Sequence, residues 1–145
     1  MSSTREKVLA AAKALVVKAL PSAKVDRNRP TPESPNAGGD AILYDGDPGD
    51  PEIDLSPLRY NYVHRIPVAL LAYAGVADDD REDALDDMLV AIGQAIAADR
   101  TLGGLVEWFD AEAPNPDDLA LAGAEPGRSC DLILVAQYAT PTPLT

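Results

Sequence analysis

Two groups of carboxylates are the first residues in this sequence that could do chemistry, because clustered carboxylate oxygens bind hard cations such as Ca²⁺. One is the acidic run 78–87, and the other is the segment 45–50, which has three aspartates in six residues. The acidic run lacks the glycine and the alternating ligand spacing of a calcium loop. Acidic residues also favour the first turn of a helix, and glycine with proline favours a tight turn. We therefore predict a helix start and a turn, and no metal site.

The single histidine, His64, and the single cysteine, Cys130, are the side chains through which nucleophilic catalysis would have to act. Both lie in stretches of alternating apolar residues, a pattern typical of packed strand positions. No glycine-rich loop of the dinucleotide-binding or P-loop type occurs. We predict no catalytic residue, no cofactor and a protein that is not an enzyme. A small-ligand enzyme with a pocket near His64 or Cys130 stays open as an alternative.

Two segments show the apolar spacing that predicts amphipathic helices. The first covers residues 3–20, where Ser3 and Glu6 have the spacing of a capping box and Pro21 ends the helix. Its apolar side contains Val8, Ala12, Leu15, Val16, Ala19 and Leu20. The second covers residues 79–98 and has an apolar stripe at steps of three and four, made of Leu85, Met88, Leu89, Ile92 and Ile96.

Apolar runs and alternation predict strands over residues 23–27, 41–44, 52–58, 59–73, 105–112 and 129–140. We expect 41–44 and 52–58 to pair as a hairpin through the turn at 45–51. In the longest strand one face is predicted to be buried, and Pro67 is expected to place the strand at an edge or at a bulge. The last strand is apolar on both sides, which predicts a central strand covered on each face.

This order of elements predicts a single α+β domain over residues 1–145, with an N-terminal and a central helix packed on a mainly antiparallel sheet. The loop 29–39 has three prolines and two glycines, so we expect it to be flexible. The segment 139–145 is expected to be an extended tail that is held only by a partner. Both segments are predicted to become ordered when the protein docks.

The charge of the chain is negative overall and unevenly distributed. The 145 residues carry a net charge of −12, yet residues 1–44 hold seven basic and four acidic side chains, against five and twenty in residues 45–145. Such an excess of acid argues against ordinary nucleic-acid binding, which releases counterions to Lys and Arg. Two interpretations stay open: the acidic excess keeps the protein in solution, or the asymmetry supports head-to-tail contacts between copies. No apolar window approaches the length of a membrane span, so we expect no membrane association.

Three segments carry a resemblance to a known family: LSPLRYNYVHR at 55–65, RTLGGLVEW at 100–108 and YATPTPL at 138–144. They resemble small phage and prophage proteins that are similar to the tail terminator, or tail completion, proteins of long-tailed phages and gene-transfer particles. The resemblance extends over essentially the whole chain through the order of its helices and strands. It implies a homohexameric ring that caps the tail tube, stops its polymerisation and joins the tail to the head or neck.

The implied partners are further copies of the chain, the tail-tube protein and a neck or connector protein, and DNA would pass through the lumen without specific binding. The implied location is the head-proximal end of a virion tail, assembled in the host cytoplasm. Other ring-forming connector proteins and tail-tube proteins stay open as alternatives. On this resemblance, and on the charge asymmetry, we predict a subunit interface or a tube or neck interface that includes Arg27, Asn28, Arg29, Arg59, Asn61 and Arg65.

Overall fold

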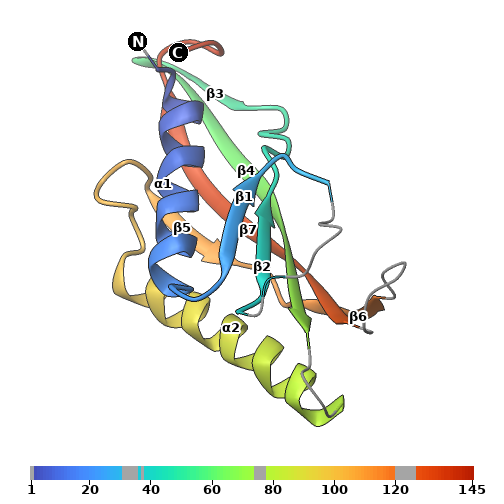
Figure 1. Ribbon diagram of the computed structural model, residues 1–145. Helices are drawn as coiled ribbons and strands as arrows, with labels where there is room; N and C mark the ends of the chain where they lie inside the picture. Colours follow the sequence, from blue (N-terminus) through green and yellow to red (C-terminus); the bar gives the residue numbers. More distant parts are fainter. Residues whose placement is uncertain (1, 31–35, 37, 74–77, 120–126) are drawn as a thin grey trace.

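The computed structural model describes residues 2–30, 36, 38–73, 78–119 and 127–145. Within them the chain forms two helices and a sheet of seven strands. In chain order these elements are α1 (Thr4–Ala19), β1 (Lys24–Arg27), β2 (Asp40–Leu43), β3 (Glu52–Leu55), β4 (Leu58–Tyr73), α2 (Asp78–Ala98), β5 (Trp108–Ala111), β6 (Asn115–Leu119) and β7 (Gly127–Thr140). Both predicted helices are confirmed to within one residue at each end, and the chain is an α+β single domain (Figure 1).

The sheet has the order β1-β2-β4-β7-β5, with β3 paired to β4 and β6 paired to β7. Only β1 and β2 are parallel, and every other pair is antiparallel. The mainly antiparallel sheet is therefore confirmed. Its centre is the long ladder between β4 and β7, whose register runs without interruption from Tyr60↔Thr140 to Tyr73↔Gly127.

The prediction from Pro67 was wrong for the strand as a whole, because β4 lies in the interior of the sheet and its register with β7 is unbroken. On the other side of β4 it holds locally, because Pro67 lies beyond the β2 ladder and three residues (44–46) stand opposite two (66–67) between the pairs Leu43↔Val68 and Asp47↔Arg65. The carbonyl of Pro67 accepts a hydrogen bond from Tyr44 N at 2.9 Å, directly after β2 ends at Leu43. In an antiparallel strand the N–H and C=O of one residue point to the same neighbouring strand. The missing N–H of Pro67 therefore falls on the β2 side, just beyond the end of the β2 ladder, where no regular ladder bond is lost.

The predicted hairpin between 41–44 and 52–58 was also wrong. The strand β2 pairs with the far end of β4, through Asp40↔Leu71 to Leu43↔Val68. The strand β3 instead pairs with the beginning of β4, and the two-residue turn at Ser56 and Pro57 joins them. The segment 45–51 therefore connects two strands that lie along different parts of β4.

The helix α1 begins at a side-chain cap, where Ser3 Oγ accepts a hydrogen bond from Glu6 N at 3.2 Å. The Glu6 carboxylate does not complete a capping box at this end, because it is engaged by Arg27. The predicted apolar side is confirmed for Val8, Ala12, Val16 and Leu20, and Leu9 is buried as well. In α2 the stripe is buried at Leu85, Met88, Ile92 and Ile96.

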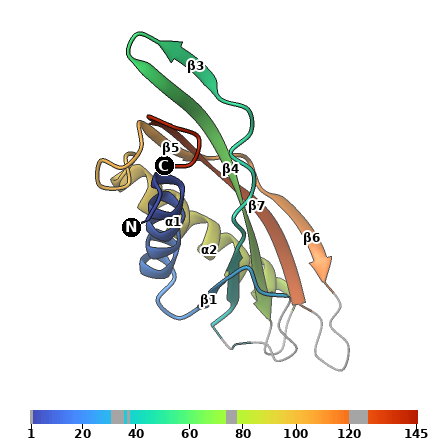
Figure 2. The same cartoon turned by 90° about the horizontal axis from the view of Figure 1, so that it is seen from above.

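Both helices lie on the same side of the sheet, as Figure 2 shows. The core between them contains the even-numbered residues of β4 from Tyr62 to Leu70 and those of β7 from Cys130 to Tyr138. The expectation that β7 is covered on each face was wrong for this part of the chain. Its other face carries the exposed Asp131 and Gln137 and the half-buried Ile133 and Val135.

The segment 139–145 differs from the predicted extended tail. Residues 139 and 140 complete β7, and residues 141–145 fold back in bends and turns. Thr4 N donates a hydrogen bond to Thr145 O at 2.7 Å, which satisfies one of the free donors in the first turn of α1. Of the predicted loop 29–39, residues 31–35 and 37 lie outside the described residues.

Candidate assembly surfaces

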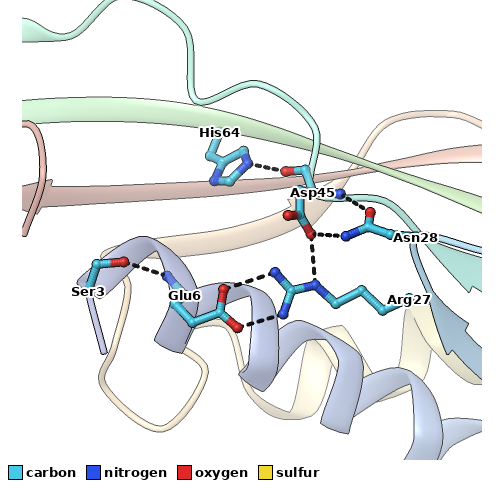
Figure 3. A network of polar contacts seen from close by, with 6 residues as sticks. All are labelled: Ser3, Glu6, Arg27, Asn28, Asp45 and His64. Atoms are coloured by element: carbon cyan, nitrogen blue, oxygen red, sulfur yellow. Dashed lines mark hydrogen bonds and ion pairs between the residues drawn. The ribbon is translucent and has the colours of Figure 1, made fainter. Parts of the chain in front are cut away.

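A polar cluster joins α1, β1 and the segment after β2 (Figure 3). Arg27 donates to both carboxylate oxygens of Glu6, at 2.6 and 2.9 Å, and its Nε donates to Asp45 Oδ1 at 2.7 Å. These hydrogen bonds raise the pKa of the Arg27 guanidinium and lower the pKa of Glu6 and of Asp45. Arg27 therefore holds the connection between β2 and β3 against the first helix.

Asp45 is fixed from two further sides. Asn28 exchanges two hydrogen bonds with it: Nδ2 donates to Asp45 Oδ1 at 3.0 Å, and Asn28 Oδ1 accepts from Asp45 N at 3.2 Å. Asn28 adopts a left-handed backbone conformation with φ of 54°, which asparagine tolerates better than most residues. The Asp45 carbonyl accepts from His64 Nε2 at 2.6 Å (Figure 3).

His64 is fully buried, and both of its ring nitrogens are used. Because the Asp45 carbonyl can only accept, Nε2 carries the proton and Nδ1 accepts from the Tyr138 hydroxyl at 3.0 Å. Burial lowers the pKa of His64 and raises the pKa of Tyr138 to about 12. The histidine is therefore neutral at pH 7 and anchors the connection to β4, as expected for a packed strand residue.

Three of the predicted interface residues lie together on the face of the sheet that the helices leave uncovered. Arg59, Asn61 and Arg65 alternate with buried residues along β4. Arg59 pairs with Glu107 at 2.7 Å, Arg65 makes a bidentate pair with Glu112, and Asn61 donates to Asp54 and to the carbonyl of Glu52. These side chains thus have partners within their own chain, and the acids of a second copy would have to compete for them.

The middle of this face carries two exposed apolar side chains, Val63 and Trp108, on either side of Gln137, and its rim is acidic. We call it the open face and define it by Asn61, Val63, Arg65, Trp108 and Gln137. The register aligns Val63, Gln137 and Trp108 across three strands, with Val63 56% and Trp108 43% exposed. A hollow of about 510 Å³ beside Val63 is lined by the carboxylates of Asp50, Glu52, Asp54 and Glu107. Exposed aromatic and aliphatic side chains inside a polar rim are typical of protein interfaces.

A second exposed apolar surface lies on the hairpin formed by β3 and the beginning of β4. Figure 2 shows that this hairpin extends beyond the layer of the two helices. Its side chains on the helix side of the sheet therefore have no cover: Ile53 is 52%, Leu55 81% and Leu58 49% exposed. We call these three residues the hairpin patch. Clustered exposed aliphatic side chains mark sites of protein contact.

The structure divides the six predicted interface residues into groups. Arg27 and Asn28 belong to the polar cluster. Asn61 and Arg65 belong to the open face, and Arg59 lies beside them on the same side of the sheet. The backbone carbonyl of Arg29 accepts from the Tyr44 hydroxyl at 3.1 Å. Neither the hairpin patch nor Trp108 was predicted as an interface from the sequence. The signal for the patch was Ser56-Pro57 between two leucines, because a turn flanked by apolar residues predicts a hairpin at that point.

The side chains considered for catalysis and metal binding are placed as follows. Cys130 is buried in the core, and burial raises the pKa of its thiol, as expected for a packed cysteine. Within the described residues no group of three or more His, Cys, Asp or Glu side chains is arranged to hold a metal ion. The side chains of residues 78–81, at the start of the acidic run, lie outside that description.

No protein-family model matches the chain, and no curated protein is significantly similar to it. In the parts of the chain that the structure describes, no helix is long and apolar enough to cross a membrane.

Proposed function

We propose that this protein is a structural subunit of a phage-like tail: a homohexameric ring that caps the tail tube, terminates its polymerisation and joins the tail to the head or neck. A subunit of such a ring needs one surface for its neighbours and another for the tube or neck. The observation that supports this role is the presence of two exposed apolar surfaces on opposite faces of one sheet, the hairpin patch and the open face.

The charge of the chain fits the same role. Residues 45–145 hold fifteen more acidic than basic side chains, and four carboxylates surround the hollow of the open face. Carboxylates that face a DNA channel keep phosphates from binding, and an acidic rim favours a basic partner protein. The particle in which the subunit works is a virion, a prophage-derived tail or a gene-transfer particle, assembled in the cytoplasm of the host.

The test is the mass of the purified protein by light scattering across concentration, with and without the tail-tube protein. A ring of about 90 kDa, six copies of 15.3 kDa, that blocks tube elongation is the expected result. Unlimited polymerisation of the protein alone would instead identify a tube protein. A protein that leaves tube growth unchanged would contradict the proposal and favour another ring-forming connector.

The open face supplies a variant that separates the two contacts. Val63→Glu places a charge at the centre of this face without touching the hairpin patch. We expect the variant to form the ring and to lose the ability to stop tube growth. Val90→Glu is the matched control, since Val90 is 49% exposed on α2, away from both surfaces, and should behave like the wild type.

A further inference from the structure

A groove between the two helices is lined mainly by small apolar side chains. It has a volume of about 520 Å³, within the ~300–1,000 Å³ typical of binding sites. Its walls come from the C-terminal half of α1, the C-terminal end of α2 and the turn that follows it, and include Ala11, Ala14, Leu15, Ala95 and Leu102. Alanine on both helices lets another chain approach closely, so the groove is suited to branched aliphatic side chains.

The hairpin patch is apolar and projecting, and the groove is apolar and concave. They lie in different parts of the molecule. The hairpin leaves the sheet where Tyr62 and Thr140 meet Ser3 and Arg5, at the N-terminal end of α1, and the groove lies along the C-terminal half of that helix (Figures 1 and 2). A hairpin of one copy would therefore fill the groove of another copy, which is a head-to-tail contact that can close into a ring.

The charges along the hairpin and along α1 are opposite, and the one carboxylate among the described residues that line the groove, Asp99, accepts a hydrogen bond from Gly103 N. The segment 47–55 that leads into the hairpin carries four carboxylates and no basic residue. Along α1, Lys7 and Lys18 lie on the same side as Ala11 and Ala14, because steps of three and four residues repeat on one helix face. Both lysines are exposed, and Lys18 lines the groove. The acidic segment of one copy would thus meet the basic helix of the next.

From this complementarity we infer that the hairpin patch of one copy docks in the α1–α2 groove of a second copy, and that this contact builds the ring. The occupant of the groove is Leu55 with Ile53 and Leu58 of the neighbour. The inference rests on the proposed role as an assembling subunit and adds the two surfaces that its ring contact uses.

Two single variants and a mixture test the contact in the full chain. Leu55→Glu removes the most exposed residue of the hairpin patch, and Ala14→Glu adds bulk and negative charge to the groove. Each should weaken self-association by at least about 30-fold, the effect of losing a hot-spot side chain. Because each variant keeps one intact surface, an equimolar mixture should form dimers and nothing larger. Val90→Glu should assemble like the wild type.

A cysteine pair provides a second measurement that does not depend on affinity. The native Cys130 is buried. A cysteine introduced by Leu55→Cys or Ala14→Cys would therefore be the thiol that reacts at the surface. Under mild oxidation the two single variants, mixed, should form a disulfide-linked dimer. Leu55→Cys mixed with Val90→Cys should not. Circular dichroism and thermal unfolding of every variant confirm that each is folded.

The outcomes separate this inference from the proposed function. The inference would be overturned if Leu55→Glu and Ala14→Glu both assembled as strongly as the wild type. It would also be overturned if the mixed Leu55→Cys and Ala14→Cys variants gave no disulfide-linked dimer. Either result counts even if the protein still blocks tube growth. If the contact is found but tube growth continues, the docking inference stands and the proposed function falls.

Discussion

His64 connects three parts of the fold through two hydrogen bonds. Its Nδ1 accepts a hydrogen bond from the Tyr138 hydroxyl, and its Nε2 donates one to the backbone carbonyl of Asp45, in the segment after β2. Arg27 also connects parts of the fold, because its guanidinium forms ion pairs with Glu6 of α1 and with Asp45 of the segment between β2 and β3. At the scale of single residues, the base of the projecting hairpin is fixed by buried or half-buried polar groups.

The burial of His64 predicts a dependence of stability on pH. Its pKa is lower in the folded chain than the ordinary value of 6.5, so the unfolded chain binds a proton first as the pH falls. Stability should therefore decrease as the pH is lowered from 7.5 to 5.5. Each unit between the two pKa values corresponds to about 1.4 kcal/mol. The measurement is urea unfolding at several pH values in this window.

His64→Gln is the control for that prediction, because glutamine can donate to the Asp45 carbonyl without titrating. Burial raises the pKa of Asp40, which works in the opposite direction in both proteins. The difference between wild type and variant therefore isolates the histidine. Equal pH dependence in the two proteins would show that His64 does not titrate in this way.

Arg27→Gln should destabilise the fold by about 1–2 kcal/mol, because it removes charge-assisted hydrogen bonds to two carboxylates that are themselves nearly half exposed. Arg29→Gln is the neighbouring control. No side-chain hydrogen bond or ion pair of Arg29 is found within the described residues, so its effect should stay below about 0.5 kcal/mol. Denaturant unfolding measures both, and equal losses would contradict the role assigned to Arg27.

At the scale of elements, the connection between β2 and β3 decides where the hairpin points. It runs against the unpaired side of β4, where Arg65 N donates to Asp47 O at 3.4 Å. The close approach depends on Gly46, which has a φ of 66°. A Cβ at that position would lie 2.1 Å from the carbonyl oxygen of Arg65, so only glycine fits.

Gly46→Ala should therefore cost more stability than Gly49→Ala. Both glycines have positive φ, a conformation that costs an alanine about 1–2 kcal/mol. No atom lies within 4 Å of a Cβ placed at Gly49, whereas at Gly46 the chain must also move away from β4. We expect a further loss of about 1–3 kcal/mol for Gly46→Ala, as in overpacked cores. Similar melting temperatures for the two variants would disprove the close approach.

At the scale of the whole molecule, the helices cover one face of the sheet and leave the other available. Trp108, the only tryptophan, lies on this open face with the Arg100 guanidinium 4.9 Å from its ring centre. The open face also holds the acidic hollow, so a partner with a basic and apolar surface would match it. This arrangement gives the proposed tube contact an intrinsic fluorescent reporter.

Docking of the tail-tube protein should move the emission of Trp108 to shorter wavelength and protect it from acrylamide quenching, because a half-exposed indole becomes buried. A tube protein without tryptophan, by substitution if needed, keeps the signal specific. Val63→Glu should abolish the change and Val90→Glu should preserve it. If the tube protein co-sediments with the wild type while the emission stays unchanged, the tube binds elsewhere.

The sequence alone determined the elements whose signal is local. The helices followed from apolar residues at steps of three and four, and the buried face of β4 followed from alternation through His64 and Ile66. The burial of Cys130 was predictable for the same reason. These patterns repeat within one element, so they do not depend on which other segment packs against it.

The tertiary structure alone decided which segments pair and which side chains stay free. The local pattern predicted that 41–44 pairs with 52–58. In the structure β3 pairs with the beginning of β4 and β2 pairs with its end, because strand pairing depends on contacts between residues distant in the sequence. The sequence likewise predicted Arg27 and Arg65 as interface residues, and the fold pairs them with Glu6 and Glu112 of the same chain. The exposure of Leu55 arises because the hairpin extends past the helices, and no residue spacing encodes the length of that extension.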